Sequence, residues 1–315
     1  MYQIRRAIRS EGEVIRQNEF PVGDPTLEYL TFPLLERTEV VKHLFTTRLG
    51  GTSRGIFSTM NLSFHRGDDE KCVLENYRRI GQVLGIRLEN MVLSQQTHTT
   101  NIRTVTDEDA GKGITKPLDY DNIDGLVTNV EGLALVTSYA DCVPLYFVDP
   151  IKRVIGLAHS GWRGTVERMG AHMVAHMSKE FGCDPKDIRA AIGPSICQDC
   201  YEVSEDVAER FLDAFAGEIS EDEKMQREPE QCSFLGGTNG KYRHMVEPGV
   251  EPGKYQLDLW RANLMVLRSA GITPDHIAVT DICTCHNPEY LFSHRASQGR
   301  RGNLCAFLLL LPAEM

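Results

Sequence analysis

The chain has 315 residues, of which 41% are hydrophobic and 25% charged, as in a globular protein with a large buried core. Its net charge of −10, with no concentrated Lys/Arg run, argues against nucleic-acid binding. The N-terminal MYQIRRAIRS lacks the apolar segment of a secretory signal, and the apolar run 306–312 is too short to span a bilayer, so we expect no membrane association.

The cysteine content gives a first indication of cellular compartment. Nine cysteines are scattered along the sequence without a regular framework. Together with the missing export signal, this pattern favours reduced thiols and a cytoplasmic location. Some of these thiols are therefore candidates for metal binding or catalysis.

The first third of the sequence predicts strands around one helix. Residues 1–40 alternate apolar and polar positions, which predicts an N-terminal β extension. A strand is expected at 43–47, an amphipathic helix at 69–85, and a short strand at 91–96 that leads to His98.

The middle of the sequence has the most informative pattern. Residues 124–128 and 133–138 predict a hairpin around a Glu-Gly turn. Two buried strands, 142–149 and 153–159, then place Cys142 at the start of one and His159 at the end of the other. The SGWRG segment that follows has glycines before a predicted helix, a context in which free backbone N–H groups can bind an anion.

The remaining sequence alternates helices and strands. The predicted elements are helices at 164–181, 204–215 and 258–270 and strands at 188–192, 277–282 and 303–310. Residues 218–254 are acidic and then rich in Gly and Pro, which predicts an exposed insertion. The interleaving indicates an α/β fold with mixed sheets, which we interpret as a single catalytic domain over residues 1–315.

His98, Cys142 and His159 are the main candidates for chemistry. Two imidazoles and a thiolate are suitable ligands for a catalytic zinc, although their long spacing has no recognisable pattern. The same residues allow a metal-free alternative, in which Cys142 is a nucleophile, His159 its base, and His98 or Asp141 orients the pair.

Four further cysteines allow a structural metal site. Cys197-x-x-Cys200 and Cys283-x-Cys285 have spacings similar to those of zinc knuckles. The alternative is that these are free thiols in adjacent loops.

Several arginines stand in Gly- or Ser-containing loops. If they converge on the Cys142–His159 hairpin, the site would recognise phosphate or carboxylate, because guanidinium groups bind these anions bidentately. The alternative is that they are solvated. The arginines concerned are Arg48, Arg163, Arg295 and Arg300.

Ten segments together resemble the laccase-domain purine nucleoside phosphorylase family (the YfiH/YlmD type, once labelled multicopper polyphenol oxidase). They are residues 46–53 (TTRLGGTS), 60–62 (MNL), 76–78 (NYR), 96–98 (QTH), 123–128 (IDGLVT), 140–144 (ADCVP), 158–164 (AHSGWRG), 192–196 (IGPSI), 201–203 (YEV) and 292–295 (FSHR). The resemblance implies a layered α/β sandwich and a catalytic zinc bound by His98, Cys142 and His159.

The resemblance also implies an activity. A zinc enzyme of this kind would phosphorolyse adenosine, inosine and S-methyl-5′-thioadenosine with inorganic phosphate, and would deaminate adenosine. On this interpretation Arg48 and Arg163 hold phosphate and Asp141 transfers protons. A copper oxidase is not expected, because the ten histidines are scattered and no His-x-His pair occurs.

Two other functions remain open at this point. One is a metal-free Cys–His hydrolase or amidase that uses the same Cys142. The other is a role in peptidoglycan-precursor editing or as a non-catalytic binding module of the cell envelope, a possibility raised by related proteins.

Overall fold

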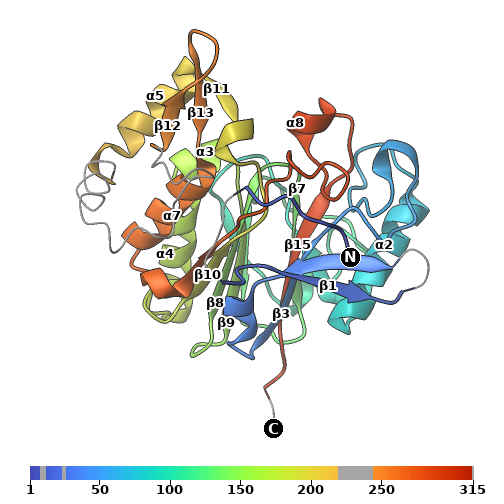
Figure 1. The fold of residues 1–315 in the computed structure, drawn as a ribbon. Helices are drawn as coiled ribbons and strands as arrows, with labels where there is room; N and C mark the ends of the chain where they lie inside the picture. Colours follow the sequence, from blue (N-terminus) through green and yellow to red (C-terminus); the bar gives the residue numbers. More distant parts are fainter. Residues whose placement is uncertain (8–11, 23–25, 219–243, 314–315) are drawn as a thin grey trace.

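Two six-stranded sheets form the centre of the molecule (Figure 1). The computed structural model describes residues 1–7, 12–22, 26–218 and 244–313. The first sheet has the order β1 (Arg16–Phe20), β2 (Leu27–Thr31), β3 (Val41–Thr46), β15 (Leu304–Leu310), β7 (Ala134–Tyr139), β4 (Met91–Leu93). The second has the order β14 (Ile277–Val279), β10 (Arg189–Ile192), β8 (Val143–Asp149), β9 (Val154–Ser160), β6 (Gly125–Thr128), β5 (Ile102–Thr104).

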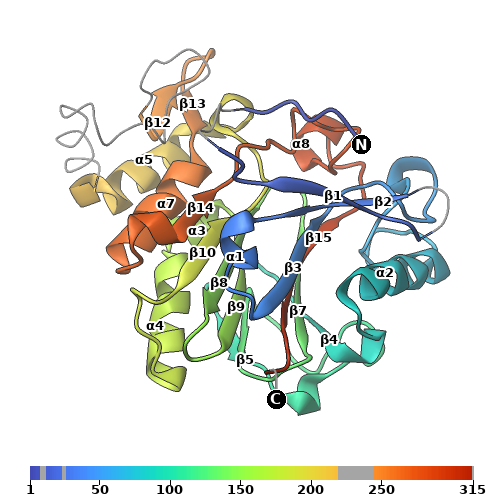
Figure 2. The same cartoon turned by 60° about the horizontal axis from the view of Figure 1, so that its bottom comes forward.

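Helices cover the outer face of each sheet (Figure 2). The described helices are α1 (Pro33–Glu36), α2 (Glu70–Leu84), α3 (Trp162–Val166), α4 (Met169–Phe181), α5 (Glu205–Ala214), α7 (Leu259–Ser269) and α8 (His294–Ser297). A small sheet of β11 (Glu202–Ser204), β13 (Lys254–Leu257) and β12 (Val246–Pro248) lies beside α5. No described helix is long and apolar enough to cross a bilayer.

Side-chain alternation along the central strands builds the layers. In β8, Leu145 and Phe147 pack in one apolar cluster with residues of α4 and α7, whereas Tyr146 and Val148 pack in another cluster with the first sheet. In β15, Phe307 faces a third cluster that includes the apolar side of α2. Successive strand residues point to opposite faces, and every residue of β8 and β15 is buried, so both faces of each sheet are covered. The predicted layered α/β sandwich with mixed sheets is confirmed, in the order α/β/β/α.

Several predicted elements form where the sequence places them. The Asp69 side chain accepts a hydrogen bond from Lys71 N, and Gly85 ends α2 with φ 76°, a conformation that favours glycine. β8 and β9 form the predicted antiparallel hairpin, with Val143 opposite Ser160. This register brings the start of β8 and the end of β9 to the same edge of the second sheet.

Two predictions about connectivity are wrong. β6 and β7 do not form a hairpin: β6 pairs with β5 and β9 in the second sheet, and β7 pairs with β4 and β15 in the first. The Glu131-Gly132 turn therefore leads from one sheet to the other. The helix predicted at 164–181 is two helices, α3 and α4, separated by Arg168 in a left-handed conformation with φ 61°.

The structure describes most of the N-terminal extension but only part of the predicted 218–254 insertion. β1 and β2 form in the predicted N-terminal β extension and pair with each other at the edge of the first sheet. Residues 219–243, most of the predicted 218–254 insertion, lie outside the described residues. The residues that follow them form β12 and β13.

A buried histidine between the sheets predicts a pH-dependent stability. His43 Nε2 accepts a hydrogen bond from Phe32 N (2.8 Å), and burial lowers the pKa of the imidazole from 6.5 to about 3. The unfolded chain therefore binds this proton more readily than the folded one between those values. Its contribution to the free energy of unfolding is present above pH 6.5 and is lost as the pH falls towards 3, by up to about 1.4 kcal/mol per pH unit.

We expect His43→Gln to reduce that slope, because the amide oxygen can still accept from Phe32 N but does not titrate. The measurement is the free energy of unfolding by urea between pH 4 and 7 for both proteins. Equal slopes would contradict the buried, neutral state of His43.

Candidate metal centre

Three segments bring His98, Cys142 and His159 together at one edge of the sandwich. Cys142 immediately precedes β8, His159 lies near the end of β9, and His98 lies in the loop after β4. One ligand atom from each residue lies within 4.8 Å of the other two. His98 is exposed, Cys142 half-buried and His159 buried, so the group is open to solvent on one side.

Asp124 holds two of the three ligands in place. Its carboxylate accepts hydrogen bonds from the backbone N–H groups of Thr97, His98 and Thr99 (each 3.0 Å) and lies 2.8 Å from His159 Nδ1. Nδ1 of His159 thereby faces the carboxylate and Nε2 is left for a metal, the usual arrangement of a carboxylate–histidine–metal triad. Burial raises the pKa of Asp124, but the hydrogen bond from His159 and those from the backbone outweigh it and leave the pKa below its ordinary value.

Gly161 leaves room for the three ligands. A Cβ at this position would lie 3.0 Å from His98 Cδ2 and 3.2 Å from Cys142 Sγ. These distances are shorter than ordinary van der Waals contact, so a larger residue would push the ligands apart. Gly161, the first glycine of the predicted SGWRG segment, lies directly before α3 and lets the three ligands approach one another.

Charge within the group favours a thiolate. Burial raises the pKa of Cys142, but attraction to His159 and hydrogen bonds with His159 and His98 outweigh it and lower the pKa to about 6. For His159, burial lowers the pKa, while attraction to Cys142 and the hydrogen bond with Asp124 raise it to about 9. A thiolate is the form of cysteine that binds metals and acts as a nucleophile.

A cavity of about 430 Å³ opens beside the three ligands. His65, Arg66 and Arg301 provide a basic wall, and Phe64 provides aromatic surface. Arg301 is buried, its Nε has no hydrogen-bond partner among the described residues, and burial together with repulsion from Arg66 lowers its pKa to about 10. The cavity therefore joins a metal-ligand set to groups that can bind an anion.

The other predicted site residues lie outside the lining of this cavity. Asp141 is buried, and its two carboxylate oxygens accept hydrogen bonds from Thr284 Oγ1 (2.6 Å) and Arg295 N (2.7 Å). Arg48 donates to the carbonyl oxygens of Ser58 and Pro288.

Arg163 is exposed, with its guanidinium 4.4 Å from the Trp162 ring centroid. The catalytic roles predicted for Asp141, Arg48 and Arg163 stay predictions.

Three residues of the site were not predicted from the sequence: Asp124, Arg66 and Arg301. Asp124 has a recognisable sequence signal, because it is a carboxylate directly before strand 125–128. In the structure every residue of that strand is buried. Arg301 follows Arg300 in a Gly-rich loop, and only the fold distinguishes the buried arginine from the exposed one.

Comparison with known proteins identifies the family. The sequence model described as multi-copper polyphenol oxidoreductase laccase matches residues 42–311. The chain belongs to this family.

Two relatives of this laccase-family protein have activities in their names. Purine nucleoside phosphorylase YlmD of Geobacillus stearothermophilus is 36% identical over 264 residues, 84% of this chain and 88% of the relative. Adenosine deaminase RL5, from an unidentified prokaryote, is 30% identical over 271 residues, 85% of this chain and 93% of the relative. The crystal structure of YfiH from Bacillus licheniformis has a TM-score of 0.76 and 31% identity, over 93% of this chain and 98% of that one.

The metal-binding side chains of this protein do not fit the multicopper site that the family's name describes. Among the described residues, two groups of His, Cys and acidic side chains could hold a metal: His98–Cys142–His159, and Cys197–Cys200–Cys283–His286. Neither has the clustered imidazoles of a multicopper centre. The first offers two imidazoles and one thiolate and leaves one tetrahedral position open, which fits a single catalytic zinc ion.

Asp124→Asn tests the support of the metal centre in this laccase-family protein. We expect zinc affinity to fall about 10- to 100-fold, because the amide loses the charge that orients His159 and can accept fewer of the loop's N–H bonds. Competition with a chromophoric chelator measures the affinity. Asp121→Asn, at an exposed position three residues earlier, is the matched control, and unchanged affinity in both proteins would contradict the role of Asp124.

Proposed function

We propose that the protein is a zinc-dependent purine nucleoside phosphorylase acting on adenosine, inosine and S-methyl-5′-thioadenosine, with adenosine deaminase activity. The observation that carries the proposal is the convergence of His98, Cys142 and His159 at a cavity that also contains Arg66 and Arg301. The names of the phosphorylase and deaminase relatives support the same reaction classes. On this proposal residues 1–315 form one catalytic domain that works in the cytoplasm.

The three proposed metal ligands and Asp124 have distinct roles. His98, Cys142 and His159 hold zinc, which supplies a Lewis acid and lowers the pKa of water to about 7. Asp124 keeps His159 in the required tautomer.

The basic wall is our candidate for the phosphate site. In phosphorolysis, a phosphate oxygen bonds to the anomeric carbon of the sugar as the bond to the purine nitrogen breaks, and the base takes a proton. Arg301 and Arg66 can hold phosphate in the cavity that contains the metal ligands, since guanidinium groups bind phosphate bidentately. Phe64 offers a surface on which the purine can stack.

Asp141 remains our sequence-based candidate for proton transfer. Each of its oxygens accepts one hydrogen bond, from Thr284 Oγ1 or Arg295 N, and keeps a second lone pair that could take a proton. A second contribution is positional, because Asp141 precedes Cys142 and its φ of 89° sets the turn into β8.

Metal removal is the direct test. We expect chelator-treated protein to lose phosphate-dependent cleavage of adenosine and inosine and added zinc to restore it, with the loss exceeding about 100-fold because the Lewis acid is absent. Cys142→Ala should show the same loss without rescue, whereas Cys72→Ala, a half-buried cysteine of α2, should keep full activity. Full activity of metal-free protein would refute the proposal.

Arginine variants test where phosphate binds. We expect Arg301→Gln to raise the KM for phosphate by about 10- to 100-fold, the range for loss of a charge-assisted hydrogen bond, with a smaller effect on the KM for nucleoside. Arg300→Gln, at the exposed neighbouring position, is the control. The same assay of Arg48→Gln and Arg163→Gln decides whether the sequence-based candidates contribute, and an unchanged phosphate KM in Arg301→Gln would contradict our placement of the anion.

The structure also supports a second candidate function, a metal-free Cys–His hydrolase or amidase. Cys142, His159 and Asp124 have the order of a catalytic triad, in which a carboxylate orients the imidazole that serves the nucleophile. Stoichiometric alkylation of Cys142 by iodoacetamide at the same rate with and without zinc would favour this function. Protection by zinc would favour the metal enzyme.

A further inference from the structure

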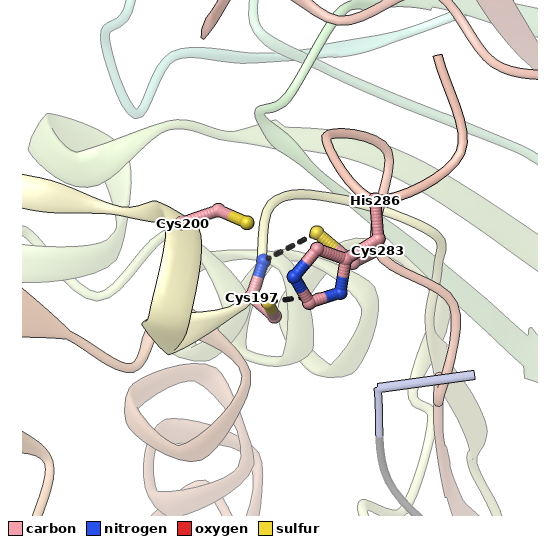
Figure 3. A group of neighbouring side chains, drawn as sticks. All are labelled: Cys197, Cys200, Cys283 and His286. Atoms are coloured by element: carbon pink, nitrogen blue, oxygen red, sulfur yellow. Dashed lines mark hydrogen bonds between the residues drawn. The ribbon is translucent and has the colours of Figure 1, made fainter. Parts of the chain in front are cut away.

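A second group of metal-binding side chains lies outside the catalytic cavity. Cys197, Cys200, Cys283 and His286 each offer a ligand atom within 4.8 Å of the others (Figure 3). Cys197 and Cys283 are buried, and Cys200 and His286 are half-buried. None of the four belongs to the cavity lining or to the His98–Cys142–His159 group.

We propose that Cys197, Cys200, Cys283 and His286 form a structural zinc site. Three thiolates and one imidazole are a common ligand set of closed, four-coordinate zinc sites, which need no open position for water. The fourth member differs from the sequence prediction, which paired Cys285 with the other cysteines. Cys285 is not part of the group.

The spacing of the ligands supports the assignment. Cys197 and Cys200 are separated by two residues, as are Cys283 and His286. A pair of such x₂ motifs, one from each of two segments, is a recurrent arrangement in zinc sites. Cys197 directly precedes the one-turn helix Gln198–Cys200, of which Cys200 is the last residue, and the second pair follows β14.

One contact within the group has a length close to that expected around a tetrahedral ion. With Zn–S bonds of about 2.3 Å, two sulfur ligands lie about 3.8 Å apart, and a sulfur and a nitrogen slightly closer. Cys197 Sγ lies 3.9 Å from His286 Nδ1. Cys197 N donates a hydrogen bond to Cys283 Sγ (3.3 Å), so this sulfur already accepts the backbone hydrogen bond that commonly accompanies a metal-bound thiolate.

The surrounding backbone indicates what the ion would stabilise. Ser195 and Cys283 form an isolated parallel bridge, and Thr284 N donates to Ser195 O (3.1 Å). Thr284 Oγ1 donates to Asp141, and Ile196 N donates to Asp141 O (3.0 Å). Zinc would therefore clamp the segments after β10 and β14, both of which contact the residue that precedes Cys142.

A Cys142→Ala background separates the two metal sites. We expect this variant, purified under reducing conditions with zinc present, to retain about one equivalent of zinc per protein molecule. Adding Cys283→Ser should remove that equivalent, and adding Cys72→Ser instead should not. Cobalt substitution provides a spectroscopic readout, because in Cys142→Ala the first site has no thiolate, so thiolate-to-cobalt charge-transfer absorption arises from the proposed site.

The outcomes are distinct from those of the phosphorylase test, since no activity is measured. Less than half an equivalent of zinc in Cys142→Ala, or no charge-transfer absorption with cobalt, would overturn the proposal. Zinc retained by Cys142→Ala/Cys283→Ser would also overturn it. If that double variant does not fold, the zinc content and cobalt absorption of Cys142→Ala alone decide.

Discussion

The hydrogen bonds of a single carboxylate set the geometry of the candidate metal centre. Asp124 precedes β6 of the second sheet, yet it binds three N–H groups of the loop that follows β4 of the first sheet. It also fixes His159 on β9. The distance between two ligands from different sheets is thus determined locally, by one side chain, rather than by the packing of the sandwich as a whole.

Loops at the same edge complete the cavity and are fixed by polar contacts. Asn303, just before β15, donates through Nδ2 to Ser138 Oγ (2.7 Å), and its backbone N–H donates to Asn61 Oδ1 (2.9 Å). These bonds hold the backbone on either side of the basic wall, which includes Arg301 and Arg66. Residues at or near the ends of β4, β8 and β9 therefore supply the candidate metal ligands, and two other loops supply the basic wall.

Those parts of the fold that local sequence patterns determine can be predicted from the sequence. Helix α2 and the β8–β9 hairpin follow from periodicity and capping residues. The partner of β6 does not, because its residues are buried on both faces and so have no alternation that distinguishes one neighbouring strand from another.

The same reasoning applies to the two metal groups. Their places at the ends of predicted strands make His98, Cys142 and His159 candidates, but their spacing has no recognisable pattern, so only the family resemblance implies that all three bind one metal ion. The sequence prediction has Cys285 as the fourth ligand, whereas the structure has His286. The spacing of Cys283 and His286 is the same as that of Cys197 and Cys200, so the sequence does contain this signal. Asp124 has a local signal, its place directly before a strand, but its contacts and those of Arg301 involve distant segments, which no local pattern contains.

The position of β15 has a consequence for biosynthesis. This strand lies between β3 and β7, and it pairs with both along most of its length. During translation, β3 and β7 therefore lack the strand that pairs with both of them until residues 304–310 have left the ribosome. Until then, apolar strand edges are exposed on the nascent polypeptide. Such an intermediate is a natural substrate for chaperones, and its closure joins strands from opposite ends of the sequence, which slows folding.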